Sequence, residues 1–280
     1  MEKAIKRYFP IFVLPTMIAF TLGFIIPFVE GVYLSFCKFT TVNDAKFIGF
    51  ANYAKVFADE TFVHAFWYTA AFTVVSVILI NVLAFAVALL LTKGFKGTNI
   101  FRTVFFMPNL IGGIVLGYIW QLLLNGILMK FSRTLTYSST YGFWGLIILV
   151  CWQQIGYMMI IYIAGIQNIP GELIEAAEID GATKWQILKK VTIPMVMPSI
   201  TVCTFLTLTN SFKLFDQNLA LTNGEPSKMS EMLALNIFNT FYGRTGYEGV
   251  GQAKAVIFFI LVTVIALTQN YLTRRKEVQQ

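Results

Sequence analysis

The chain has 280 residues, of which 57% are hydrophobic and 12% are charged, whereas soluble domains carry about 25% charged residues. Its mean hydropathy is +0.69 and its formal net charge is +7. This composition excludes a soluble enzyme and a secreted disulfide scaffold. It also excludes an outer-membrane barrel, whose strands would alternate in hydrophobicity over about ten residues.

The apolar residues are gathered into long segments that contain no Asp, Glu, Lys or Arg. A helix needs about 20 apolar residues to cross a hydrocarbon core about 30 Å thick, and each segment is about that long or longer. We therefore predict an all-α integral membrane protein with six transmembrane helices, forming a single domain over residues 1–280. The predicted spans are 8–29, 65–92, 103–129, 142–166, 191–212 and 255–273.

The cations indicate the orientation of these spans, because Lys and Arg in short loops stay on the cytoplasmic side. Of the 21 Lys and Arg residues, 12 lie in four alternate connecting segments. We expect these segments, and with them both termini of a multi-pass protein, to be cytoplasmic. The positive charge then faces anionic lipid headgroups, and no nucleic-acid partner is expected. The first span is too long for a signal peptide and is expected to be retained. The four segments are 1–7, 93–102, 167–190 and 274–280.

Residue types needed for several chemistries are missing or scattered. His64 is the only histidine, and Cys37, Cys151 and Cys203 lie far apart in the sequence, so no metal site and no catalytic residue is predicted. The sequence contains no G-x-x-x-x-G-K-[ST] motif, so the chain is not expected to bind ATP or any other cofactor itself. If the protein pumps, a partner must supply the energy.

The segment 170–192, between the fourth and fifth spans, carries the clearest local pattern. Pro170 ends the preceding helix, and three glutamates then favour the positive end of a new helix. Gly181 interrupts this helix, and Thr183 can cap a second one. We expect two short amphipathic helices on the cytoplasmic side. The acidic first half favours contact with a groove on a soluble protein over contact with anionic lipid.

This loop also contains a specific motif, in which a Glu-Ala-Ala triplet is followed by Asp-Gly and, further on, by Ile-Pro. The sequence here resembles the EAA motif of ABC importer permeases, in the form seen in carbohydrate-uptake permeases similar to the maltose transporter. Residues 49–57, 101–125 and 221–226 look like further segments of that family. The resemblance implies that the residues that couple the chain to an ATPase are Glu175, Ala176, Ala177, Asp180, Gly181 and Pro194.

The resemblance implies the transmembrane domain of a type I ABC importer, with cytoplasmic coupling helices, in a bacterial-type cell membrane. Its implied partners are a second, homologous permease subunit, two ATPase subunits that hold ATP and Mg, an extracytoplasmic sugar-binding protein and the lipid bilayer. The implied function is that of one half of the translocation pathway for a sugar, with an oligosaccharide as the expected substrate.

Polar side chains within the fourth and fifth spans are candidates for the solute path. They fall at helical spacing on one face of each span. Amides, hydroxyls and aromatic rings suit an uncharged, polyhydroxylated ligand. For each residue an alternative stays open, namely a hydrogen bond between helices with no ligand. The candidates are Gln153, Gln154, Tyr157, Thr207, Asn210, Ser211 and Leu214.

Two other functions remain possible from the sequence. One is an ABC permease for another solute, although an anionic solute would favour Lys or Arg in the fourth and fifth spans, which contain neither. The other is a secondary transporter or channel, for which intramembrane carboxylates or discontinuous helices are expected. Only Glu30, at the edge of the first span, comes near to such a carboxylate.

Overall fold

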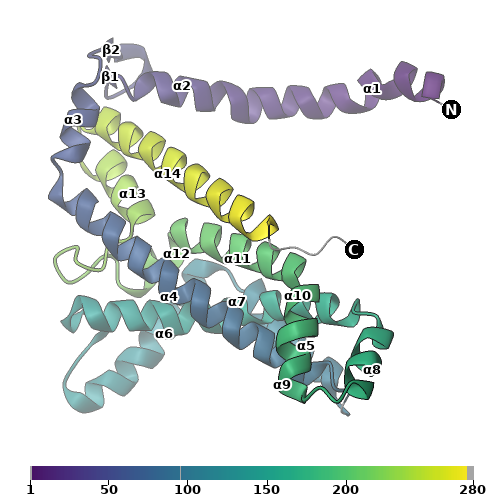
Figure 1. The fold of residues 1–280 in the computed structure, drawn as a ribbon. Helices are drawn as coiled ribbons and strands as arrows, with labels where there is room; N and C mark the ends of the chain where they lie inside the picture. The colour runs from purple at the N-terminus through teal and green to yellow at the C-terminus, as the bar shows by residue number, and fades with distance from the viewer. Residues whose placement is uncertain (1, 95, 276–280) are drawn as a thin grey trace. The chain divides into compact units, whose positions relative to one another are not determined.

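The computed structural model describes residues 2–94 and 96–275 (Figure 1). Over these residues the chain is almost entirely helical, with one antiparallel strand pair, β1 (Cys37–Lys38) and β2 (Lys46–Phe47). Five helices are long and apolar enough to cross a membrane, or six if a bent pair counts as one span. The prediction of an all-α membrane fold with six transmembrane segments is therefore confirmed.

The helices follow one another in chain order, with short connections (Figure 1). A π-helical turn, Thr21–Ile25, joins the first two helices, and a second, Leu188–Thr192, joins α9 to α10. The α-helices are α1 (Glu2–Phe20), α2 (Ile26–Leu34), α3 (Ala51–Phe57), α4 (Glu60–Leu91), α5 (Thr98–Phe106), α6 (Gly113–Leu128), α7 (Ser139–Gln167), α8 (Gly171–Ile179), α9 (Lys184–Ile187), α10 (Ile193–Met195), α11 (Met197–Phe212), α12 (Asp216–Leu221), α13 (Leu233–Gly243) and α14 (Glu248–Arg274).

The third predicted span, 103–129, needs correction because it is not one helix. Helix α5 ends at Phe106, a 3-10 turn covers Met107–Leu110, and the backbone is extended at Ile111 and Gly112 before α6 begins. Pro108 has no N–H to continue the α-helical hydrogen-bond ladder, and its ring clashes with the preceding turn. The segment is therefore broken within its apolar part.

The fifth predicted span, 191–212, is helical but sharply bent. The helical stretch Lys184–Met195 meets α11 at an angle of 69°. Pro194 and Pro198 stand in the first turns of α10 and α11, on either side of Val196. Each proline removes one backbone donor from the ladder, so the bend follows directly from the sequence.

The chain divides into two compact units. The first unit comprises the described residues of Met1–Glu60 and Ile237–Phe259. Its small core contains Leu34, Cys37 and Phe39, with Phe241 packed against them. The side-chain amide of Asn52 donates hydrogen bonds to the carbonyl oxygens of Ser35 (2.9 Å) and Cys37 (2.8 Å). This amide fixes the turn between α2 and β1.

The second unit comprises the described residues of Thr61–Asn236 and Ile260–Gln280 and is built around α7. In its most apolar 18-residue window α7 is 67% buried, against 28% for α4 and 11% for the span that begins with α6. Phe72 and Ile80 of α4 and Met158 and Tyr162 of α7 are among the buried residues of one continuous core. Helix α7 is therefore the element against which the others pack.

One lysine in the first unit is completely buried. Lys254 of α14 places its Nζ 2.7 Å from Asp59 Oδ2 and 2.8 Å from Thr240 Oγ1. A buried ammonium ion is stable only when it is paired and hydrogen-bonded. This ion pair therefore joins α14 to the residue that precedes α4, and the hydrogen bond joins α14 to α13.

We expect Lys254→Met to lower the free energy of unfolding by about 3–5 kcal/mol, because it withdraws the ammonium group from a largely buried carboxylate. The thermal unfolding midpoint of the detergent-purified chain is the measurement. Lys46→Met is the matched control, because Lys46 is exposed on β2. Equal midpoints for the two variants would contradict the expectation.

Candidate functional site

The site begins at a short helix that packs directly on α6. After α11 ends, the chain turns through Lys213–Phe215 and enters α12. A Cβ atom added at Gly113 of α6 would lie 2.7 Å from Asp216 Cβ, and one added at Gly117 would lie 2.5 Å from Ala220 Cβ. Since Cβ atoms never approach so closely, the two glycines are what allow α12 to lie in contact with α6. This contact places Gln217 beside α7.

A third glycine positions the break between α5 and α6. A Cβ atom at Gly156 of α7 would overlap the carbonyl group of Phe105, at the end of α5. The broken segment therefore rests on the backbone of α7 itself. This placement brings Asn109, which directly follows Pro108, next to the polar face of α7.

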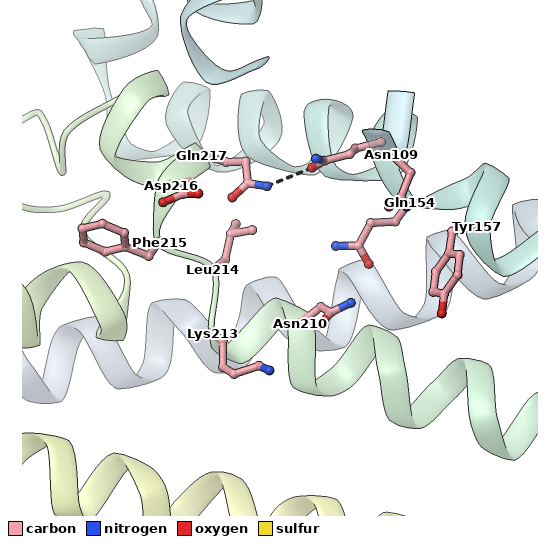
Figure 2. A pocket seen from close by; sticks show the side chains of 10 residues that line it. Asn109, Gln154, Tyr157, Asn210, Lys213, Leu214, Phe215, Asp216 and Gln217 are labelled. Carbon is pink, nitrogen blue, oxygen red and sulfur yellow. Dashed lines mark hydrogen bonds between the residues drawn. The ribbon is translucent and has the colours of Figure 1, made fainter. Parts of the chain in front are cut away.

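These elements enclose an open polar cavity of about 340 Å³ within the second unit (Figure 2). Its walls come from the turn before α6, from α7, from the end of α11 and from the start of α12. Five of the seven predicted solute-path residues lie here. The lining residues are Asn109, Gln153, Gln154, Tyr157, Asn210, Lys213, Leu214, Phe215, Asp216 and Gln217.

The two glutamines of α7 have different roles in the cavity wall. Gln153 accepts a hydrogen bond from Gln217 Nε2 (2.8 Å), drawn in Figure 2, and its own Nε2 donates to the carbonyl oxygen of Ile111 (3.3 Å). Gln154 is only 7% exposed, yet its Oε1 has no hydrogen-bond partner among the described residues. A buried acceptor left without a donor costs about 1–3 kcal/mol. Gln154 lines the cavity, but this oxygen is itself buried.

The remaining lining groups give the cavity both polar and aromatic faces. In Figure 2 the amides of Gln154 and Asn210 extend toward the same space, one from α7 and one from α11. The ring of Tyr157 stands beyond Gln154 and is 36% exposed. Lys213 and Asp216 contribute one charge of each sign, and no ion pair within 4 Å joins them in the part of the chain that the structure describes.

Two predicted solute-path residues lie elsewhere. Thr207 is fully buried and accepts a hydrogen bond from Asn81 Nδ2 (2.9 Å), while its hydroxyl donates to its own helix. Ser211 is also fully buried and is not part of the cavity wall. For Thr207 the alternative of a hydrogen bond between helices is the one that the structure shows.

Half of the cavity lining was not predicted as solute path: Asn109, Lys213, Phe215, Asp216 and Gln217. Lys213 and Asp216 stand out in the sequence, because they directly follow the charge-free fifth span. Asn109 and Gln217 gave no such signal, since their positions depend on the break before α6 and on the packing of α12. Nowhere in the described residues does a group of three potential metal ligands occur.

The segment 170–192 forms the two short helices that its sequence predicts. Helix α8 ends before Gly181, whose φ of 75° is left-handed and favours glycine. Thr183 caps α9: Gln186 N donates to Thr183 Oγ1 (3.4 Å), and Thr183 N donates to Gln186 Oε1 (2.7 Å). This reciprocal pair is a capping box.

Two large apolar side chains of this loop are exposed. Ile179, at the end of α8, is 86% exposed, and Trp185 in α9 is 69% exposed. The predicted coupling residues are exposed as well, except Ala177 and Pro194, which are half-buried. Both apolar side chains have a charged neighbour, Asp180 after Ile179 and Lys184 before Trp185.

Comparison with known proteins identifies the family. A family model described as "Binding-protein-dependent transport system inner membrane component" matches residues 80–278. The chain belongs to this family. The resemblance predicted from the EAA motif is thereby confirmed, and the chain is a multi-pass membrane permease subunit rather than a secondary transporter or channel.

Relatives extend the match over nearly the whole permease. It is 42% identical to the probable starch degradation products transport system permease protein AmyD of Thermoanaerobacterium thermosulfurigenes, covering 96% of this chain and 94% of the relative. It is 28% identical to the trehalose/maltose transport system permease protein MalF of Thermococcus litoralis, covering 89% of this chain and 88% of the relative. Among solved structures, a bacterial ABC transporter involved in import of the acidic polysaccharide alginate has the same fold, with a TM-score of 0.82, 23% identity and 98% coverage of both chains.

The close approach at Gly156 allows a test of whether the end of α5 packs against α7. We expect Gly156→Ala to lower the free energy of unfolding of the permease by about 1–3 kcal/mol, because the methyl group forces the backbone at Phe105 away from α7. Thermal unfolding of the purified permease is the measurement. Gly126→Ala is the control, since no atom lies within 4 Å of its added Cβ. A stable Gly156→Ala variant would show that α5 does not rest on α7.

Proposed function

We propose that this permease forms half of the translocation pathway of an ATP-driven, binding-protein-dependent importer of a neutral sugar, with an oligosaccharide as the expected substrate. The observation that carries the proposal is the open polar cavity lined by the amides of Gln154 and Asn210 and by Tyr157. Relatives named for starch degradation products and for trehalose and maltose support it.

The cavity chemistry supports an uncharged, polyhydroxylated ligand. The amides of Gln154 and Asn210 can each both donate to and accept from sugar hydroxyls, and the exposed ring of Tyr157 can cover an apolar sugar face. Lys213 and Asp216 balance in charge, so the lining favours neither an anion nor a cation. A volume of about 340 Å³ lies within the usual range for small-ligand pockets, about 300–1,000 Å³.

Energy is proposed to enter through α8 and α9. Their exposed apolar groups, Ile179 and Trp185, fit a groove on one of the two ATPase subunits, which would hold ATP and Mg. The proposed assembly therefore contains a second, homologous permease subunit, two ATPase subunits and an extracytoplasmic sugar-binding protein. In this assembly the loop 170–192 and both termini face the cytoplasm.

Transport assays on Gln154 test the solute site. The assay uses proteoliposomes that contain the complete transporter and its binding protein. Gln154→Leu should reduce oligosaccharide uptake about tenfold, because a hydroxyl group of the bound sugar then loses its hydrogen bond to the Gln154 amide. Gln167→Leu is the control, since Gln167 is exposed at the end of the same helix. The proposed site is wrong if Gln154→Leu transports like the control.

Charge and backbone changes in the loop test the energy coupling. We expect Gly181→Asp and Glu175→Lys to leave the membrane dimer assembled while ATP hydrolysis no longer drives uptake. The first change introduces a Cβ at a left-handed position, which costs about 1–2 kcal/mol, and the second reverses an exposed charge. ATP hydrolysis and uptake are measured on the same vesicles, with Glu60→Lys as a charge-reversal control, because Glu60 is exposed and lies outside this loop. Normal uptake in both variants would rule out this coupling surface.

A further inference from the structure

A chain of hydrogen bonds links three long helices of the second unit and is not part of the cavity wall. Tyr162 of α7 donates its hydroxyl hydrogen to Asn81 Oδ1 of α4 at 2.6 Å. Asn81 Nδ2 in turn donates to Thr207 Oγ1 of α11 at 2.9 Å, and to the carbonyl oxygen of Val77 at 2.8 Å. One amide on α4 therefore bonds to both α7 and α11.

The direction of each hydrogen bond in this chain is fixed. The hydroxyl of Thr207 donates to the carbonyl oxygen of Cys203 at 2.8 Å, so toward Asn81 it can only accept. Both hydrogens of the Asn81 amide are used, one on Thr207 and one on Val77, while its oxygen accepts from Tyr162. A carboxylate, a hydroxyl or an alkyl group at position 81 cannot reproduce this pattern.

The surroundings make these bonds costly to break. Tyr162 is 1% exposed and Thr207 is 0% exposed, so neither hydroxyl can turn to water instead. Polar groups within an apolar environment need a partner inside the protein. The three helices are therefore held at one relative position by their polar groups, in addition to their apolar packing.

Both linked helices also form walls of the cavity. Tyr162 lies on α7 a little over one turn beyond Tyr157, and Thr207 lies on α11 three residues before Asn210. Helix α11 is also the element that follows the bend at Val196 and, before it, the loop 170–192. Asn81 thus connects α11, which follows the loop in the chain, with α7, which forms another wall of the cavity.

We propose that Asn81 is a positioning residue for transport, which makes α7 and α11 move together when the loop 170–192 is displaced. The inference rests on the proposed function, because it takes that loop as the point where ATP hydrolysis acts. Asn81 does not touch the solute. Its role is to transmit a displacement of α11 to the wall that carries Gln154 and Tyr157.

The test compares ATP hydrolysis with uptake in proteoliposomes containing the complete transporter and its binding protein. We expect Asn81→Leu to assemble normally and to keep its stimulated ATP hydrolysis, while uptake falls about tenfold, so that more ATP is consumed per sugar molecule. Asn81→Ala should behave alike, because a methyl group can neither donate to Thr207 nor accept from Tyr162. Thr209→Val is the matched control, since the Thr209 hydroxyl bonds only to carbonyl groups of its own helix.

A second comparison separates this chain from general loss of packing. Tyr162→Phe removes the hydrogen bond from Tyr162 to Asn81, and Thr207→Val removes the one from Asn81 to Thr207. We expect neither substitution to reduce uptake further when it is combined with Asn81→Leu. A proportional fall of hydrolysis and uptake in Asn81→Leu, or additive losses in the double variants, would overturn the proposal.

A measurement without solute distinguishes failure of this inference from failure of the proposed function. Spin labels at Ile160 of α7 and Val202 of α11, both partly exposed, report the separation of the two helices in the assembled transporter. We expect one narrow distance distribution in the otherwise unchanged chain, with and without ATP, and a broad one in Asn81→Leu. Equal distributions in both chains would overturn the positioning role, whatever sugar is transported.

Discussion

Backbone groups freed by a break in an apolar segment need partners within the protein or in a water-filled cavity, and the structure depends on how α7 meets this constraint. The break between α5 and α6 leaves backbone groups outside any helical ladder. The carbonyl oxygen of Ile111 accepts from Gln153 Nε2, and the carbonyl group of Phe105 lies against Gly156. Helix α7 therefore supplies a hydrogen-bond donor to the break and a glycine against which the backbone of α5 packs.

The same donor links the break to the rest of the cavity. Gln153 bonds to Ile111 with its nitrogen and to Gln217 with its oxygen, so one side chain joins the turn before α6 to α12. Its neighbour Gln154 also lines the cavity, and its oxygen is buried without a hydrogen-bond partner among the described residues. Of these two adjacent amides, Gln153 links separate elements of the fold, whereas Gln154 remains part of the cavity wall.

The sequence was sufficient where local physics decides the outcome. Bilayer thickness sets the length of the charge-free runs, and Gly181 and Thr183 shape the loop 170–192 through their own backbone and cap. It was insufficient where a distant partner decides. Thr207 looks the same on a helical face whether it meets a sugar or Asn81, which lies 126 residues away. Pro108 likewise allows either a kinked continuous helix or a full break, and the broken segment packs against Gly156 of another helix, a contact that the local sequence does not reveal.

The bend at Val196 explains why a hydrogen bond from α11 to a neighbouring helix matters. Prolines on both sides of the bend remove backbone N–H donors. The stretch Lys184–Met195 and α11 are therefore joined by fewer helical hydrogen bonds than a continuous helix would have. In the proposed mechanism, a displacement of the loop would act on α11 at this point. The direct contact of α11 with α7 includes a weak hydrogen bond from Cys203 Sγ to the carbonyl oxygen of Met158 (3.7 Å). A directional bond from Asn81 to Thr207 is lost as soon as the helices slide, and it therefore holds them in one register.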